Sequence, residues 1–204
     1  QRFALVGSHS HNEISIEVNP DDVARDRVRF WRARGVNRLS LGVQAFDDDV
    51  LRFLGRCHDT SVARRACELI GGEFENWGID LIFGAKPPDR WVASVEQCIA
   101  FAPTHVSTYA LTYEERTPFW SQRADAVDDD IALDQYRHAI ATLGAGGYVH
   151  YEVSNFARPG HESAHNLIYW RNEEYAGFGP GAVGYLGGVR MRNLSNIARY
   201  LERP

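Results

Sequence analysis

The pattern of apolar and polar positions switches repeatedly between period two and a helical period along the chain. Residues 13–18, 38–43 and 105–111 place apolar side chains on one face of a strand, and residues 78–83 form an almost continuous apolar run. A continuous run of this kind is typical of a parallel strand in a sheet that helices cover. The four segments therefore predict four strands of one sheet.

Helical patterns follow these segments, with glycine or proline at several of the boundaries. Helices are expected at residues 48–54, 61–70, 90–101 and 128–143, a fifth strand at 148–153 and a short amphipathic helix at 196–201. After the first strand, Asp21 or Asp22 is placed to cap a further helix that ends at Gly35. Alternation of this kind predicts parallel strands joined by crossover helices, in a doubly wound sheet or a barrel. No strand is followed by Gly-x-Gly-x-x-Gly, which favours the barrel.

Three segments organise the chain. Residues 1–12 form a start that contains Gly-Ser-His-Ser-His at 7–11, a sequence typical of an expression scar or a disordered turn. Residues 13–153 carry the strand and helix pattern of the barrel. Residues 154–204 are rich in Asn, Gly and aromatic side chains, so they are predicted to be an extension and not another repeat.

Composition narrows the class of partner. The net charge is -5 over 204 residues, with acidic and basic residues mixed, so no one-signed patch is expected to attract nucleic acid. No apolar run approaches the roughly 20 residues of a membrane span, and the chain is expected to be soluble and cytoplasmic. Its three cysteines, Cys57, Cys67 and Cys98, are scattered, which favours reduced thiols and predicts no metal site.

Polar residues follow the predicted strands closely. In a parallel barrel the carboxyl ends of the strands carry the active groups, and the residues expected there are Glu17, Asn19, Gln44, Asp80 and Thr112. Carboxylates at these ends can grip ribose hydroxyls or an ammonium group, and Arg56 can pair with a carboxylate. Together these groups suit a small zwitterionic ligand. The alternative is that they hydrogen-bond to loop backbones or form ordinary ion pairs.

Several motifs resemble one known family. They are Glu17-Val18-Asn19-Pro20, the segments at 35–44, 54–56, 76–84, 107–112, 151–157 and 177–182, and His165-Asn166-Leu167-Ile168-Tyr169-Trp170. In this order they resemble radical S-adenosylmethionine (SAM) proteins of the oxygen-independent coproporphyrinogen III oxidase-like family, and specifically its HemW-type haem chaperones. The resemblance covers nearly the whole chain. The last motif is what separates this branch from other radical SAM proteins.

The resemblance implies a fold and a ligand site. The expected fold is α/β, a partial TIM-like (βα)6 radical SAM barrel of parallel strands that lacks the first strands, with SAM and a [4Fe-4S] cluster at the carboxyl ends. Matching positions carry the SAM contacts over to Glu17, Gln44, Arg56 and Asp80, and place Ala110 against adenine. The implied function is to bind haem and deliver it to haem-acceptor proteins, and the family leaves room for a homodimer.

His165 is the implied axial ligand of haem, since iron accepts imidazole. A histidine beside aromatic residues also serves as a hydrogen-bonded packing element, and Trp170 is expected to be buried. The chain lacks the family's Cys-x-x-x-Cys-x-x-Cys loop and Gly-Gly-Thr-Pro strand end, so the sequence leaves open whether it is an enzyme. Two alternatives to the chaperone stay open: an oxygen-independent coproporphyrinogen III oxidase that acts by radical decarboxylation, and a truncated barrel without catalysis.

Overall fold

The computed structural model describes residues 12–117, 119–121 and 126–202. It divides the chain into two compact units, Gln1–Glu162 and Ser163–Pro204, which are described in turn. The predicted scar at residues 7–11 lies outside the described residues, as does all of the start at 1–12 except residue 12.

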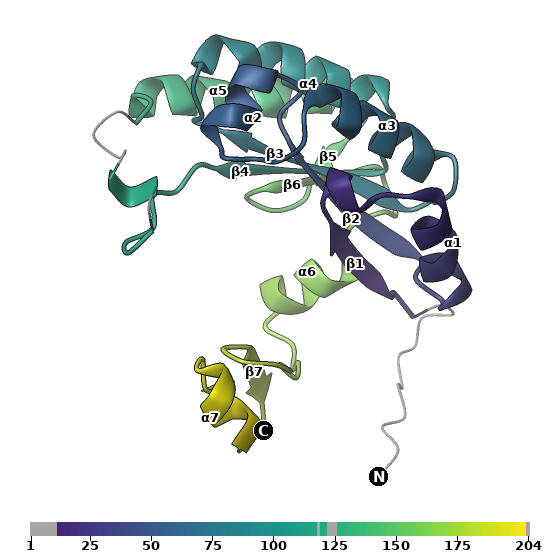
Figure 1. The fold of residues 1–204 in the computed structure, drawn as a ribbon, viewed down its shortest axis with the longest axis vertical. Coiled ribbons are helices and arrows are strands. Elements are labelled where there is room, and N and C mark those ends of the chain that lie inside the picture. Colours follow the sequence, from purple (N-terminus) through teal and green to yellow (C-terminus); the bar gives the residue numbers. More distant parts are fainter. Residues whose placement is uncertain (1–11, 118, 122–125, 203–204) are drawn as a thin grey trace. The chain divides into compact units, whose positions relative to one another are not determined.

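The first unit is built on one six-stranded sheet, in the order β1-β2-β3-β4-β6-β5 (Figure 1). The strands are β1 Ser15–Val18, β2 Arg38–Gln44, β3 Trp77–Phe83, β4 His105–Ala110, β5 Val149–His150 and β6 Asn155–Ala157. β1 to β4 are parallel neighbours in sequence order. The prediction of four adjacent parallel strands from residues 13–18, 38–43, 78–83 and 105–111 is therefore confirmed.

The sheet changes direction after β4. β6 pairs antiparallel with β4, and β5, only two residues long, pairs antiparallel with β6. The prediction of a fifth strand at 148–153 that continues the repeat is wrong. The reversal places Phe156 of β6 opposite Val106 of β4, where both side chains are fully buried in the core. The sheet thus extends past residue 153 into the segment that the sequence assigned to the extension.

Helices connect the strands of the first unit. They are the 3-10 turn η1 Pro20–Asp22, α1 Arg25–Ala33, α2 Asp48–Phe53, α3 Thr60–Gly71, the 3-10 turn η2 Pro88–Arg90, α4 Trp91–Ala100 and α5 Asp129–Ala145. Asp47, Asp59 and Asp128 cap α2, α3 and α5, each accepting from backbone N–H groups of the first turn. The expected cap of α1 by Asp21 or Asp22 is wrong, because both residues belong to η1, and α1 starts after Ala24 without a side-chain cap.

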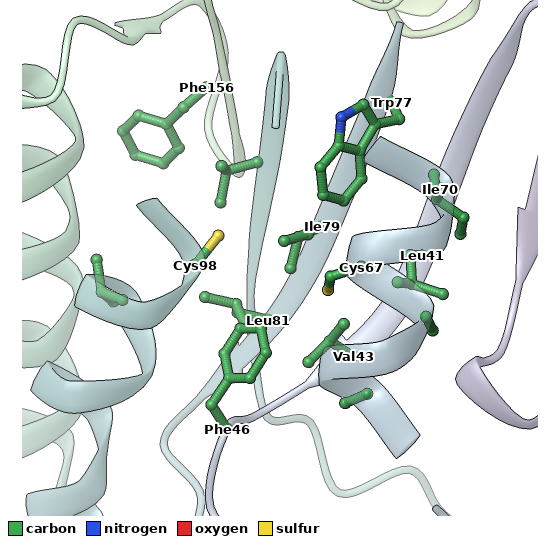
Figure 2. Close-up of a cluster of buried hydrophobic side chains, with 14 of the residues drawn as sticks. Leu41, Val43, Phe46, Cys67, Ile70, Trp77, Ile79, Leu81, Cys98 and Phe156 are labelled. Atoms are coloured by element: carbon green, nitrogen blue, oxygen red, sulfur yellow. The ribbon is translucent and has the colours of Figure 1, made fainter. Parts of the chain in front are cut away.

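The core lies between the sheet and the helices α3, α4 and α5 (Figures 1 and 2). Leu41 and Val43 of β2 and Ile79 and Leu81 of β3 are fully buried there, as Figure 2 shows. Removing such a side chain from water contributes about 1.5–3 kcal/mol each. Since these apolar residues take alternate positions, the residues between them face the opposite side of the sheet.

The second unit is small and has two helices and one hairpin among its described residues. They are α6 Ala164–Trp170, β7 Val183–Leu186, β8 Val189–Arg192 and α7 Ile197–Glu202. β7 and β8 pair antiparallel, and Tyr175 forms a bridge to Tyr185 of β7. The helix predicted at 196–201 is confirmed as α7. None of the helices in the described part of the chain is long and apolar enough to cross a membrane.

Candidate functional site

A polar face lies on the side of the sheet opposite the core. Strand register brings its members together, because Glu17 of β1 pairs with Ser40 of β2, and Asp80 of β3 pairs with Ser107 of β4. Paired residues of parallel strands point to the same side. We use the term polar face for these four residues and Tyr109, which lies two positions beyond Ser107 on the same side. All four parallel strands thus contribute a hydroxyl or carboxylate to this face.

Asp80 is the centre of the polar face. The Ser40 hydroxyl donates to its carboxylate at 2.9 Å from Oδ1 and 3.1 Å from Oδ2, and the Ser107 hydroxyl bonds to it from the other side. Burial raises the pKa of Asp80 to about 6, even though both serine bonds lower it. The sequence predicts that Asp80 lies at the carboxyl end of its strand. In the structure β3 continues for three more residues, to Phe83, so Asp80 lies within the strand.

Glu17 and Tyr109 lie close to Asp80. The charge of Glu17 contributes to the raised pKa of Asp80. The pKa of the Tyr109 hydroxyl is raised by burial, by Asp80 and, more weakly, by Glu17 and Glu152, while its bond to Ser107 opposes this. The charges of three carboxylates, Asp80, Glu17 and Glu152, therefore act on the hydroxyl of Tyr109. Such a surface is suited to a ligand that donates hydrogen bonds, such as a ribose or an ammonium group.

Gln44 closes β2 with an unusual backbone. Its φ is 70°, and the N–H of Ala45 donates to the Val43 carbonyl at 2.9 Å, which makes a γ-turn centred on Gln44. A side chain on Gly42 would place its Cβ 2.7 Å from Nε2 of Gln44, so the glycine leaves the room that this amide occupies. Asn19 brings its Oδ1 to the same place. The side chains of Gln44 and Asn19 thus both lie beside Gly42, near the carboxyl ends of β2 and β1.

The other predicted ligand residues are arranged differently. Arg56 follows α2, and its buried Nε has no hydrogen-bond partner. Ala110 is paired with Phe83 and lines a pocket of about 280 Å³ beside α5, on the side of β4 opposite Asp80. Thr112 bonds only to the carbonyl of Ala110, at 3.4 Å, which fits the backbone-bonding alternative.

The fit of the implied groups can be judged from these residues. The orphaned Nε of Arg56, the amide of Gln44 and the carboxylates of the polar face are donors and acceptors of the kind that SAM requires, so these residues fit it. A [4Fe-4S] cluster does not fit the described residues. No group of three metal-binding side chains occurs among them, Cys57 is exposed, and burial raises the pKa of Cys67 to about 12 and that of Cys98 well above its usual value.

His105 is a buried residue of the same side of the sheet that the sequence did not single out. Its Nε2 lies 2.8 Å from the Tyr151 hydroxyl, and its Nδ1 has no hydrogen-bond partner. Burial, with a contribution from Arg38, lowers its pKa to about 3, so the ring is neutral. A Cβ on Gly78 would lie 3.3 Å from both Cβ and Nδ1 of His105, so the glycine makes space for the imidazole.

In the second unit, His165 and Trp170 lie on α6. Nε2 of His165 is 2.8 Å from the Tyr169 hydroxyl, one helical turn further on. The side chain of Trp170 is 58% exposed, so the expectation that it is buried is wrong. α6 is seven residues long and has no buried residue, so its aromatic side chains do not pack into a hydrophobic core. These rings are therefore available at the surface of the unit.

Comparisons with solved structures indicate the class of protein to which the fold belongs. No protein family model matches the chain. The solved structure of coproporphyrinogen III oxidase (HemN) from Escherichia coli, a radical SAM enzyme, matches with a TM-score of 0.79 and 26% identity over 94% of this chain and 48% of that chain. The archaeal Elp3 of Methanocaldococcus infernus matches with a TM-score of 0.56 and 18% identity over 62% of this chain and 32% of its own, which supports the fold alone. The first unit therefore has the α/β fold of a partial radical SAM barrel.

Sequence relatives narrow this class. The haem chaperone HemW is 38% identical in Bacillus subtilis, over 97% of this chain and 54% of the relative. HemW of Synechocystis is 40% identical over 93% of this chain and 48% of the relative, and HemW of Escherichia coli is 40% identical over 84% and 46%. The chain is thus a homologue of the HemW haem chaperones, as its motifs indicated, and it spans about half the length of these relatives.

Proposed function

We propose that this chain acts as part of a haem chaperone, with a SAM site on the polar face and a haem contact on α6. The observation that carries the proposal is the meeting of Glu17 and Asp80 on one face, beside the strand end that bears Gln44. These positions match the motifs of a family whose relatives are named haem chaperones. A polar face of this kind is more than the core of the fold requires, because Ser40, Asp80 and Ser107 are buried or half-buried polar side chains on one side of the sheet.

Each residue has a role in the proposed SAM site. The carboxylates of Glu17 and Asp80 would accept from hydroxyl or ammonium groups, and Gln44 would both donate and accept. The unpartnered Nε of Arg56 would donate to the ligand's carboxylate. Ala110 would contact adenine only through its backbone at the end of β4, because its side chain lies on the other side of the strand. A [4Fe-4S] cluster beside bound SAM would supply radical chemistry, and the described residues do not hold one. The cluster ligands would have to come from residues other than those described.

Haem would be bound by the second unit. His165 is exposed and sits with Tyr169 and Trp170 on the same short helix, so a flat ligand has an imidazole and two aromatic rings to contact. The haem iron would take the imidazole of His165 as an axial ligand. This requires either that Nε2 gives up its hydrogen bond with the Tyr169 hydroxyl or that the iron binds Nδ1 instead. Delivery to haem-acceptor proteins, a homodimer and a cytoplasmic location complete the proposal.

The second candidate function is oxygen-independent coproporphyrinogen III oxidase. The fold likeness to HemN, with a TM-score of 0.79, favours it. The two functions differ in what happens to the tetrapyrrole, because the oxidase decarboxylates its propionates and the chaperone keeps haem intact. Anaerobic titrations with haem and with coproporphyrinogen III separate them without a cluster: tighter binding of coproporphyrinogen III would support the oxidase, and tighter binding of haem supports the chaperone.

Two binding experiments test the sites separately. Calorimetric titration with SAM should show about tenfold weaker binding in Glu17→Gln, since a hydrogen bond to a charged group is lost, and no change in Asp134→Asn, which removes an exposed carboxylate of α5. Titration with haem should show a shifted Soret band and weaker binding in His165→Ala, with His150→Ala, an exposed histidine of the first unit, as the control. Equal SAM affinity in both carboxylate variants, or an unchanged Soret band in His165→Ala, would remove the corresponding site.

A further inference from the structure

His58 is a buried histidine that the motifs and the proposed SAM contacts leave without a role. It lies in the loop between α2 and α3, two residues after Arg56, and is 4% exposed. Its two ring nitrogens face different segments of the first unit. Nε2 is 3.1 Å from the carbonyl oxygen of Val43, and Nδ1 is 3.7 Å from Oδ2 of Asp21. The ring therefore connects the loop that bears Arg56 to the ends of β1 and β2.

The Val43 carbonyl is the atom that closes the turn at Gln44. It accepts from the N–H of Ala45 at 2.9 Å and from the imidazole of His58 at 3.1 Å. Gln44 has a positive φ of 70°, a conformation that a residue with a side chain adopts at a cost and keeps only when its surroundings hold it. The second donor on this carbonyl is thus part of what holds the strained turn.

The contact with the Val43 carbonyl determines which ring nitrogen of His58 carries the proton. A carbonyl oxygen only accepts hydrogen bonds, so Nε2 carries the proton and donates it. Nδ1 contacts the carboxylate of Asp21, which lies two residues after Asn19. The side chain of Asn19, like the Gln44 amide, lies beside Gly42. His58 thus touches the backbone of the turn and the segment that follows β1. In the described part of the chain, its hydrogen bond and its ion pair both lie outside the polar face.

We infer that His58 is a positioning residue that holds the Gln44 turn, and with it the amide of Gln44, at the carboxyl end of β2. The inference rests on the proposed SAM site, because the turn matters to binding through Gln44. A residue with a purely packing role would affect stability without changing the turn or the affinity. The two roles are therefore separable by measurements made at the turn itself.

Three variants of the full chain separate them. His58→Leu keeps an apolar side chain of similar size and removes the donor to Val43. His58→Gln keeps an N–H at about the position of Nε2 and should restore the bond. Tyr148→Phe is the matched control, because Tyr148 is also buried and its hydroxyl donates at 2.7 Å to a backbone carbonyl, that of Pro103, before the amino end of β4.

Two readouts follow the turn and the ligand. Hydrogen exchange at the N–H of Ala45, the amide that closes the turn, should be about fivefold faster in His58→Leu, and SAM should bind about fivefold more weakly, as expected when one hydrogen bond of about 1 kcal/mol is lost. His58→Gln should return both values close to those of the unaltered chain. Tyr148→Phe should lower the melting temperature and leave both values unchanged.

Unchanged exchange at Ala45 in His58→Leu would overturn the inference, and so would an equal loss of SAM affinity in Tyr148→Phe. If the unaltered chain does not bind SAM at all, the proposed function fails, while exchange at Ala45 still decides whether His58 holds the turn. Should His58→Leu not fold, His58→Asn replaces it, since its shorter amide places its N–H away from the Val43 carbonyl.

Discussion

Replacing Asp80 with asparagine is expected to stabilise the protein at alkaline pH while weakening its proposed ligand site. The carboxylate is held between the hydroxyls of Ser40 and Ser107, and burial raises its pKa from 3.8 to about 6. Asparagine has nearly the same shape, carries no charge, and can accept from one serine and donate to the other. It therefore resembles the protonated form of Asp80, which the folded state prefers.

The magnitude follows from the two pKa values. A difference of one pH unit corresponds to about 1.4 kcal/mol, so ionised Asp80 costs the folded state about 3 kcal/mol relative to the unfolded chain. The cost is absent below pH 3.8, where both states are protonated, and it grows as the pH rises through about 6. Asp80→Asn should thus gain about 3 kcal/mol over the unaltered chain at pH 8, and almost nothing near pH 3.5.

Urea unfolding at pH 3.5, 6 and 8, followed by circular dichroism, measures this difference. Asp134→Asn is the control, because its exposed carboxylate lies on the outer surface of α5 and should change the free energy of unfolding by less than about 0.5 kcal/mol at each pH. A variant Asp80→Asn that is no more stable than the unaltered chain at pH 8, or a gain that does not depend on pH, would refute the assignment of the cost to the buried charge.

The remaining predictions concern a buried histidine, a surface tryptophan and the cysteines. Since burial lowers the pKa of His105 from 6.5 to about 3, the free energy of unfolding should decrease as the pH falls from 6.5 towards 3, and His105→Gln should reduce this decrease in acid titrations followed by circular dichroism. Trp170→Ala should lower the melting temperature by no more than a few degrees, because more than half of the side chain is exposed; a fall of over 10 °C in calorimetry would show that the ring is packed. Anaerobic reconstitution with iron and sulfide should give no stable cluster absorbance, because the thiols of Cys67 and Cys98 are buried with raised pKa values; about four bound irons per chain would contradict this.

Much of the first unit could be predicted from its pattern. The four parallel strands follow from short apolar runs that are long enough for a strand and too short for a helix, and the caps Asp47, Asp59 and Asp128 agree with helices that begin where the pattern changes. The reversal at β6 could not be predicted in this way. An apolar strand has the same period whether its neighbour is parallel or antiparallel, and the direction depends on a turn that the pattern does not describe.

The candidate site was predictable only in part. Glu17 and Gln44 are at strand ends, where sequence reasoning looks for chemistry, whereas Asp80 is in the middle of a strand. Ser40 carried a usable signal, since it lies between Leu39 and Leu41 in a strand and must therefore face away from the core, whereas Ser107 is followed by the polar Thr108. His58 gave no such signal, because its partner Val43 is fifteen residues away and is contacted through its backbone.

The close approach of Gly78 to His105 ties two distant positions of the sequence together. A methyl group on the glycine would meet the carbonyl oxygen of His105 at 3.2 Å and its ring at 3.3 Å, so the space of an absent side chain is filled from the neighbouring strand. A smaller residue at 105 would remove the ring but leave the carbonyl oxygen and the Cβ in place. In homologous proteins we therefore expect the glycine to be kept even where the histidine is replaced.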